Sequence, residues 1–148
     1  MLKRFAIAAI LVVGGALAGC ASVPMADTQR DATAKTFAVT AGKANIYVYR
    51  NETMGAAVKL GLHLDVMPVG ETSAKTYYLL QVLPGKHTLV STAENESAID
   101  VVTEAGKNYF VWREVKMGFL MARSKLQQVD DATGKAGVSE CSLAQGVR

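Results

Sequence analysis

The stretch that decides the fold reads TYYLLQVLPGKHTLV and spans residues 76–90. Residues 76–82 are rich in tyrosine and leucine, and residues 87–93 bring threonine and valine after the pair Pro84-Gly85. Aromatic and β-branched residues favour strands, whereas a Pro-Gly pair between two such runs favours a turn. The stretch therefore predicts two consecutive strands joined by a tight turn.

Similar short runs lie on both sides of this stretch. In ANIYVYR, residues 44–50, Ile46 and Val48 alternate with Tyr47 and Tyr49, as in a strand with two different faces. Further strands are predicted over residues 59–65, 66–72, 97–102 and 108–115. About seven short strands separated by turn residues predict an all-β fold, a single antiparallel β-sandwich, with a β-barrel as the alternative.

The C-terminal part carries a weaker pattern. One further strand is predicted around residues 125–129, followed by a short C-terminal helix capped by Asp130 or Asp131. Gly134 and Gly137 disfavour that helix, because glycine lowers helix propensity.

Residues 1–19 have the layout of a secretory signal peptide. Two cations precede the apolar run of residues 5–17, and small residues follow it. The run is shorter than the roughly 20 residues that a membrane-spanning helix needs. A retained membrane anchor is the alternative, because no charged residue occurs between Arg4 and Asp27.

Residues Leu17, Ala18, Gly19 and Cys20 resemble the lipobox of bacterial lipoproteins. In that class the signal is cut before the cysteine, a diacylglycerol is joined to the thiol, and the new amino group is acylated. The resemblance therefore implies lipid attachment at Cys20, and two or more acyl chains hold a protein firmly on a membrane. Ala21 in the second mature position implies, by the same resemblance, the outer membrane, facing the periplasm.

Residues 20–43 are predicted to form a lipidated, flexible tether in front of one domain over residues 44–148. The tether is rich in Ala, Thr, Asp and Ser and has few large apolar groups. Such a composition buries too little surface to offset the entropy of ordering. The exception is the segment Phe37 to Val39, which can pack on the domain.

The charge balance excludes one class of partner. Removal of residues 1–19 takes away Lys3 and Arg4, two of the 16 basic residues, and leaves 14 against 13 acidic residues. Nucleic-acid binding needs a clustered basic face. The sequence therefore predicts no nucleic-acid partner.

The sequence shows no catalytic or metal-binding pattern. His63 lies on the polar face of its strand, where we expect contact with solvent, and the ring of His87 can pack over a strand end. Two cysteines and two histidines have no metal-ligand spacing, and no Gly-x-Ser-x-Gly elbow or Gly-rich phosphate loop is present. We therefore expect no catalytic residue, no metal and no cofactor. For Cys141, burial as a small residue is favoured over an intermolecular disulfide.

Two sets of apolar residues are candidates for binding. Tyr47, Tyr49 and Trp112 lie in predicted strands, and on an open sheet face they could stack on sugar rings or anchor a partner. Cross-strand aromatic pairing is the alternative. The run MGFLM, residues 117–121, would be an adaptable contact patch if exposed and part of the core if buried, and burial is favoured.

The order of these elements resembles the DUF2846 group of bacterial envelope proteins, many of which are small lipoproteins. The resemblance covers residues 44–129, and its most telling parts are Ile46 to Arg50, Pro84 to His87 and Gly106 to Phe110. A looser resemblance links the chain to PEGA and transthyretin-like sandwiches, from which Val66-Met67 departs, because a glycine often follows the aspartate there. No function is assigned to the group, so the resemblance implies a β-sandwich and no active-site residues.

Together these features predict a non-enzymatic, lipid-anchored envelope protein that acts as a binding or structural module in the periplasm. The lipid on Cys20 is its expected membrane contact, and an envelope protein is its expected partner. Binding of a glycan or a small amphiphile on the aromatic face of Tyr47, Tyr49 and Trp112 is the alternative. An enzyme is the third hypothesis, and it would need a histidine, an acid and a nucleophilic serine in one cleft. The sequence predicts no particular oligomeric state.

Overall fold

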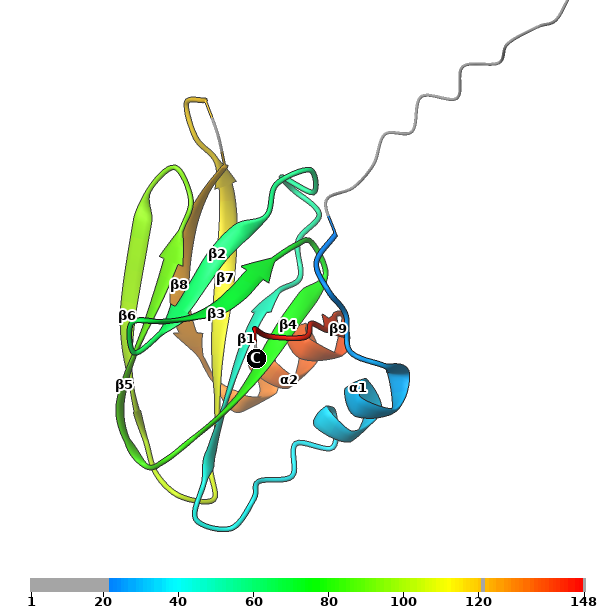
Figure 1. Cartoon of the computed structure of the whole chain (residues 1–148), viewed down its shortest axis with the longest axis vertical. Helices are drawn as coiled ribbons and strands as arrows, with labels where there is room; N and C mark the ends of the chain where they lie inside the picture. The colour runs from blue at the N-terminus through cyan, green and yellow to red at the C-terminus, as the bar shows by residue number, and fades with distance from the viewer. Residues whose placement is uncertain (1–21, 121, 148) are drawn as a thin grey trace, which may run out of the picture.

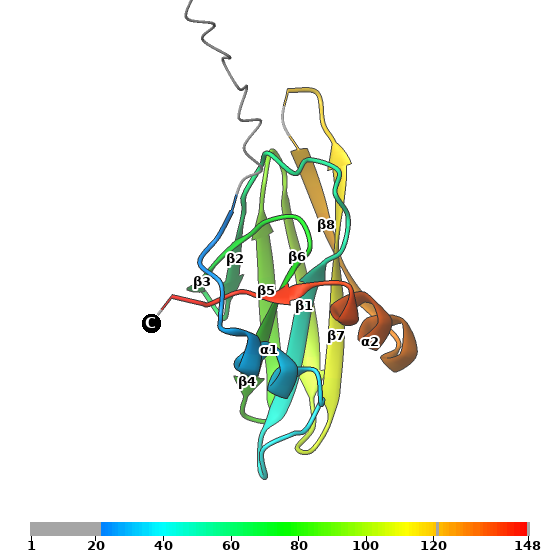
Figure 2. The same ribbon diagram turned by 90° about the vertical axis from the view of Figure 1, so that its right-hand side faces the viewer.

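The protein folds into two β-sheets packed face to face, with two helices against the outer face of the larger sheet (Figures 1 and 2). The computed structural model describes residues 22–120 and 122–147. Within these ranges the helices are α1 (Thr28–Ala34) and α2 (Asp131–Ser139). The strands are β1 (Ala44–Arg50), β2 (Leu60–Leu64), β3 (Met67–Thr72), β4 (Thr76–Val82), β5 (Gly85–Thr92), β6 (Glu96–Thr103), β7 (Asn108–Met117), β8 (Ala122–Val129) and β9 (Ser142–Leu143). The predicted all-β class and sandwich are confirmed.

The larger sheet has the strand order β8-β7-β1-β4-β9, and the smaller sheet has the order β3-β2-β5-β6. β1 pairs with β4 in antiparallel fashion but with β7 in parallel, and β4 pairs with β9 in parallel. The larger sheet is therefore mixed, which corrects the prediction of a purely antiparallel sandwich. The chain passes through the smaller sheet between β1, β4 and β7, so no hairpin fixes the relative direction of these neighbours.

β1 is buried on both faces and lies in the middle of the larger sheet. Ile46 and Val48 point between the two sheets into the main core. Tyr47 and Tyr49 point to the opposite face and pack beneath the helices. Because neither face of β1 meets water, the strand reads as a nearly continuous apolar run.

Residues 22–43 pack on the domain, which corrects the prediction of a flexible tether for this part of the chain. Val23 is 6% exposed and belongs to the main core, and Met25 forms an isolated bridge to Ala144 near the C-terminus. α1 begins after Asp27, whose side chain accepts a hydrogen bond from a backbone N–H of the first turn, an N-cap that stabilises a short helix. A few well-placed apolar groups hold the segment even though its average composition is polar.

Phe37 contributes much of this attachment, and its predicted packing on the domain is confirmed. Its ring makes edge-to-face contacts with Tyr47 and with Phe110, with centroids 5.3 Å and 5.8 Å apart. Such aromatic pairs add about 0.5–1.5 kcal/mol beyond the area that they bury. The segment between α1 and β1 is therefore fixed at its middle.

α2 confirms the predicted short C-terminal helix. Asp130 is its N-cap and accepts a hydrogen bond from the Thr133 N–H at 2.8 Å. Gly134 and Gly137 are buried against the larger sheet, where a Cβ atom on Gly137 would lie 2.1 Å from the Tyr49 ring. The glycines that disfavour the helix locally are therefore the residues that let it approach the sheet.

The turn between β2 and β3 departs from the glycine-containing pattern, as the sequence indicates. Asp65 and Val66 both have positive φ, at 47° and 65°, as in a type I′ hairpin turn. Val66 is β-branched and therefore strained in this conformation.

Two arginines that the sequence reasoning did not single out are fully buried. Arg113 of β7 donates hydrogen bonds to the carbonyl oxygens of Leu60 and Gly61, at 2.8 Å each. Arg50 of β1 donates to the Val58 carbonyl oxygen at 2.9 Å. Among the described residues, neither forms an ion pair with a carboxylate. Burial, together with the charge on Arg50, lowers the pKa of Arg113 to about 9, so its guanidinium is protonated at neutral pH.

Candidate functional site

The aromatic face that the sequence predicts for ligand binding is covered. Tyr47 and Tyr49 are buried beneath the helices, and Trp112 is half-buried on the same side of the sheet. Tyr47 stacks on its neighbour Phe110 with centroids 5.2 Å apart, which is the alternative of cross-strand pairing. Burial raises the pKa of Tyr47 and of Tyr49 to about 12. The prediction of an exposed binding face at these three residues is wrong, because α1 and α2 cover it.

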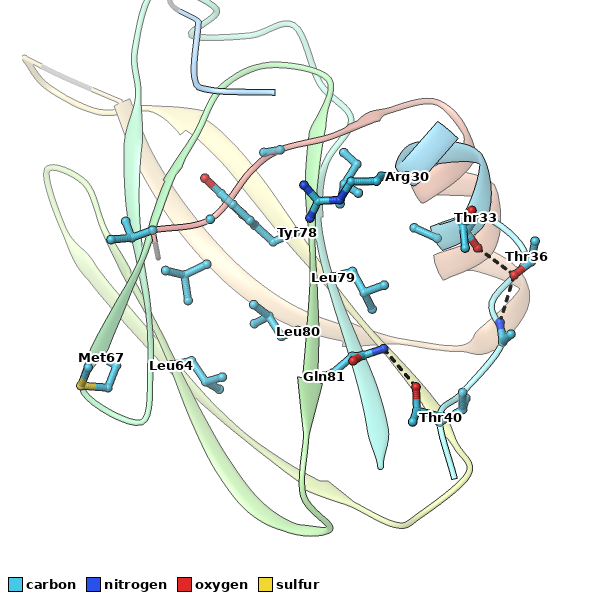
Figure 3. Close-up of a pocket in the computed structure, with 18 of the residues that line it drawn as sticks. Arg30, Thr33, Thr36, Thr40, Leu64, Met67, Tyr78, Leu79, Leu80 and Gln81 are labelled. Carbon is cyan, nitrogen blue, oxygen red and sulfur yellow. Dashed lines mark hydrogen bonds between the residues drawn. The ribbon is translucent and has the colours of Figure 1, made fainter. Parts of the chain in front are cut away.

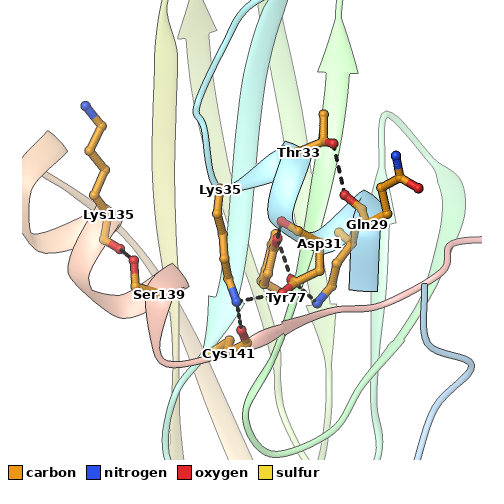
Figure 4. A network of polar contacts seen from close by, with 9 residues as sticks. Gln29, Asp31, Thr33, Lys35, Tyr77, Lys135, Ser139 and Cys141 are labelled. Carbon is orange, nitrogen blue, oxygen red and sulfur yellow. Dashed lines mark hydrogen bonds and ion pairs between the residues drawn. The ribbon is translucent and has the colours of Figure 1, made fainter. Parts of the chain in front are cut away.

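A polar network fixes α1 to the larger sheet (Figure 4). One carboxylate oxygen of Asp31 accepts hydrogen bonds from the Tyr77 hydroxyl and from the Leu143 N–H, both at 2.9 Å. The other oxygen pairs with Lys35 at 2.8 Å, and the same ammonium donates to the Cys141 carbonyl oxygen at 2.6 Å. Burial opposes the charge on Asp31, but these partners hold its pKa below the ordinary value. The network ties α1 to β4 and β9, so α1 forms a fixed wall beside β4.

An open groove of about 1090 Å³ runs beside β4 (Figure 3). α1 and residues 36–40 form one wall, β3 and the turn before it form the other, and residues 143–147 close one end. Its two sides differ in chemistry. The side toward the main core is apolar and the side toward α1 is polar, with lining residues Leu64, Val69 and Leu80 on the first and Arg30, Thr33 and Thr40 on the second.

The edge of β4 is open along this groove. Asn45 of β1 donates its backbone N–H to the Lys107 carbonyl oxygen just before β7, so the odd-numbered residues of β1 direct their backbone groups away from β4. Leu79 and Gln81 lie opposite odd-numbered residues of β1. Their N–H and C=O groups therefore point away from β1, into the groove. Among the described residues no strand pairs with them on that side.

β9 occupies the beginning of the same edge. Its residues 142–143 pair in parallel with residues 76–77 of β4. The chain then leaves β4 and crosses to β3, where the Val147 N–H donates to the Val69 carbonyl oxygen at 2.8 Å. The edge of β4 thus accepts a strand in this structure, and its remaining residues stay available.

His87 and Asp65 form a clamp between the turns that follow β2 and β4. The His87 Nδ1 lies 2.6 Å from Asp65 Oδ2, and its Nε2 lies 2.7 Å from the Leu83 carbonyl oxygen. Because the carbonyl and the carboxylate both accept, the doubly protonated ring satisfies both partners, and in that form neither ring nitrogen can take a proton from a nucleophile. The predicted packing of His87 at a strand end is confirmed. His63 is half-buried, and its buried Nδ1 has no partner among the described residues, so its contact with solvent is only partial.

We expect the His87–Asp65 clamp to stabilise the fold in a limited pH range. Burial opposes the charge on His87, but its bonds to Asp65 and Leu83 raise its pKa above 6.5, and the bond from His87 lowers the pKa of Asp65 below 3.8. A base whose pKa is higher in the folded state, such as His87, stabilises the fold fully below pH 6.5. This effect is lost as the pH rises through the folded-state pKa. An acid whose pKa is lower in the folded state, such as Asp65, stabilises the fold fully above pH 3.8. This effect is lost as the pH falls through the folded-state pKa. Asp65→Asn should therefore lower the free energy of unfolding by about 0.5–1 kcal/mol in mildly acidic buffer and by less in mildly alkaline buffer.

Urea unfolding in the two buffers measures this difference. Asp100→Asn is the matched control, because Asp100 pairs with Lys86 rather than with a histidine. The effect of the control should be the same in both buffers. An Asp65→Asn effect that is also equal in both would contradict the charged clamp.

Cys141 is buried, as the sequence predicts, and its Sγ lies 3.5 Å from the Arg50 carbonyl oxygen. Burial raises the pKa of this thiol to about 12, which keeps it in the less reactive protonated form. Within residues 22–120 and 122–147, no group of three or more His, Cys, Asp or Glu side chains is arranged to hold a metal ion. In the same part of the chain, no helix has the length and apolar character needed to cross a bilayer.

The predicted lipid-attachment site, with Leu17, Ala18, Gly19 and Cys20, lies outside the described residues, as does the rest of the predicted signal peptide over residues 1–19. Ser22 is the first of the described residues, and Val23, which follows it, already belongs to the main core.

Three residues of the apolar run 117–121 are exposed, which corrects the prediction that the run is buried. Met117, Phe119 and Leu120 are 65%, 92% and 83% exposed. Pairing between β7 and β8 ends at Met117 and Ala122, so these residues form the tip of the hairpin, beyond the part of the sheet that the core covers. We call Met117, Phe119 and Leu120 the hairpin tip.

Sequence reasoning missed the groove beside β4. TYYLLQV reads as a strand with apolar residues on both faces, and nothing in its local pattern marks which edge is open. The position of β9, a strand of two residues, decides this, and so short a strand leaves no periodic signal.

Residues 40–125 match the family model described as "Protein of unknown function (DUF2846)". An uncharacterised protein of Haemophilus influenzae (strain ATCC 51907 / DSM 11121 / KW20 / Rd) is 33% identical to this chain over 144 residues, which cover 96% of this chain and 86% of that protein. No solved structure matches the chain. The family match includes β1 to β7 and part of β8, whereas α1, α2 and β9 lie outside it.

Proposed function

The chain belongs to the DUF2846 family, and on this premise we propose that it is a non-enzymatic, lipid-anchored envelope protein that binds an extended segment of a partner protein. The partner segment adds to the open edge of β4 as an extra strand. The lipid on Cys20 holds the protein on the outer membrane, facing the periplasm. The module thus presents a peptide-binding groove at a membrane.

Lipid anchoring is supported by the basic, apolar and small-residue regions that end in Leu17 to Cys20. Metabolic labelling of cells with a clickable palmitate analogue tests it. The protein should take up label, and Cys20→Ser should remove it. Label that persists in Cys20→Ser would contradict lipid attachment at this thiol.

Peptide binding is carried by one observation, the unpaired edge of β4 beside the groove. Leu79 and Gln81 direct two N–H and two C=O groups into it. An extended peptide can satisfy these groups by strand addition, a common mode of peptide recognition. β9 already pairs with the same edge at residues 76–77, so the backbone of β4 has a geometry that a neighbouring strand can join.

The walls of the groove indicate the kind of peptide. Side chains of an added strand alternate between its two sides. Those on one side would meet Leu64 and Leu80, and those on the other would meet the polar wall with Arg30. We therefore expect a segment in which apolar residues alternate with polar or acidic ones.

Site-specific photo-crosslinking in cells tests this proposal. A photoreactive amino acid at Thr40, which is exposed in the groove, should capture one recurrent partner. The same amino acid at Val102, exposed on β6 of the other sheet, is the positional control and should not capture it.

Gln81→Pro separates strand addition from other contacts. Proline removes the outward N–H of residue 81 and leaves the pairing of β4 with β1 intact, since this N–H does not face β1. Gln81→Ala is the matched control, because it removes the same side chain and keeps the N–H. Capture through Thr40 should be lost in Gln81→Pro and kept in Gln81→Ala. Capture that survives in both variants would contradict strand addition.

A further inference from the structure

The hairpin tip has no role in the groove or in the core. Met117, Phe119 and Leu120 are the most exposed run of large apolar side chains in the described part of the chain. Exposed apolar clusters on a soluble domain mark sites of contact with a partner or a membrane. Because a connection between two strands needs none of these side chains for folding, their exposure calls for a functional account.

The start of the described chain lies toward the same end of the molecule as the hairpin tip. In both views the blue N-terminal segment enters toward the end where the hairpin of β7 (yellow) and β8 (orange) projects, and the hairpin reaches farther along the long axis (Figures 1 and 2). The turn between β4 and β5, which carries Leu83, lies at the opposite end (Figure 1).

The distance between the anchor and the domain is limited by chain length. Val23 is fixed in the main core, and three peptide units separate it from Cys20. Even fully extended, three residues span about 10 Å. A lipid on Cys20 would therefore hold this end of the domain against the bilayer surface rather than far above it.

The base of the hairpin is basic. Lys116, Arg123 and Lys125 surround a shallow pocket of about 320 Å³, and Glu96 is the acidic residue that lines it with them. Lys116 also pairs with Glu114 at 3.3 Å, whereas Arg123 and Lys125 form no ion pair among the described residues. The net positive charge lies directly behind the apolar tip, where it would meet the phosphate groups of lipids if the tip entered a membrane.

We propose that the hairpin tip inserts into the interfacial region of the membrane that carries the lipid anchor. Phe119 and Leu120 enter beside the acyl chains, and Arg123 and Lys125 contact the lipid phosphates. The inference rests on the lipid anchoring proposed above. It gives the domain a fixed orientation on the bilayer, with two points of attachment instead of one.

Depth-dependent fluorescence quenching tests this insertion. The full-length lipoprotein is reconstituted into vesicles of phosphatidylethanolamine and phosphatidylglycerol, with or without brominated acyl chains. Phe119→Trp should show blue-shifted emission that the brominated lipids quench. Leu83→Trp is the matched control, because Leu83 is 62% exposed at the other end of the molecule, and it should be neither shifted nor quenched. Trp112 is present in both variants, and its emission is subtracted with the unmutated protein.

Flotation of the same vesicles is the second measurement, and it reports whether the protein is attached to the membrane at all. Three combinations of flotation and quenching are possible, and each supports or overturns the proposal. Flotation with quenching of Phe119→Trp alone supports insertion, and adding Arg123→Gln and Lys125→Gln should then reduce the quenching. Flotation without quenching of Phe119→Trp overturns insertion and leaves lipid anchoring intact. Protein that floats no better than Cys20→Ser overturns anchoring, and insertion with it.

Discussion

Replacing Arg113 with alanine is expected to lower the free energy of unfolding by about 3–5 kcal/mol, which is a large part of the stability of a domain of this size. Arg113 is fully buried and reaches from β7 across the sandwich to the smaller sheet. Its guanidinium bonds to Leu60 and Gly61 of β2, to Thr72 Oγ1 of β3 at 2.7 Å, and to Ser91 of β5. One side chain therefore joins three strands of the opposite sheet.

The cost arises mainly from the groups that remain after the substitution. In Arg113→Ala three carbonyl oxygens, those of Leu60, Gly61 and Thr92, and two hydroxyl groups lose the hydrogen bond that Arg113 donates. A buried polar group that is left without any partner costs about 1–3 kcal/mol. Arg113→Met fills most of the volume but supplies no donor, so it should also destabilise the fold. Arg113→Lys keeps one donor group, so its free energy of unfolding should lie between those of the unmutated protein and Arg113→Met.

Urea unfolding followed by the fluorescence of Trp112 measures these changes. Arg123→Ala is the matched control, because Arg123 is exposed on β8 and forms no ion pair in the described part of the chain. Its effect should stay within about 0.5 kcal/mol. A loss of less than about 1 kcal/mol in Arg113→Ala would show that water or a rearranged neighbour replaces the guanidinium.

Gly137→Ala is expected to destabilise the protein by about 1–3 kcal/mol, even though alanine is the better helix former. A Cβ atom at this position would lie 2.1 Å from Cε2 and 2.5 Å from Cζ of Tyr49. The Tyr49 ring is buried between the sheet and α2 and has little room to move. Gly134→Ala should act in the same direction, because its Cβ atom would lie 2.1 Å from Cγ of Phe110.

The control lies on the other side of the same helix. Ala136 is exposed, so Ala136→Gly should cost about 1 kcal/mol through helix propensity alone. Thermal or urea unfolding of both variants compares the two effects. A gain in stability for Gly137→Ala, as propensity alone predicts, would contradict close packing of α2 on Tyr49.

The strands could be predicted from the sequence because each is encoded locally. The stretch of residues 44–50 alternates between two apolar faces, and Pro84-Gly85 fixes one turn. The predicted ranges of β1 and β4 coincide with the observed strands. The sequence also narrows the N-cap of α2 to Asp130 or Asp131, since a cap is a contact over three residues, and the structure has Asp130.

Features that depend on contacts between distant residues could not be predicted. The parallel pairing of β1 with β7 joins residues about 60 positions apart, and no periodicity encodes it. The cover over Tyr47 and Tyr49 comes from helices at the two ends of the chain. The burial of Arg113 also contradicts the ordinary preference of arginine for the surface.

The same distinction between local patterns and distant contacts applies to the candidate sites. A lipobox is a local pattern, so Cys20 could be proposed from the sequence. The groove depends on which strand borders β4, and β9 is too short to recognise. The exposure of Phe119 depends on where the core ends, since an apolar run of this length is equally compatible with a buried segment.

The contact between the two ends of the chain has a consequence for the order of folding. Met25 bridges to Ala144, the Gln145 N–H donates to the Pro24 carbonyl oxygen, and the Ala26 N–H donates to the Leu143 carbonyl oxygen. The N-terminal segment can therefore take its final position only after the last residues of the chain have been synthesised. In a nascent chain the N-terminal segment would therefore stay unpaired until synthesis is complete. A chain truncated before β9 would keep the whole outer edge of β4 free for pairing with other molecules.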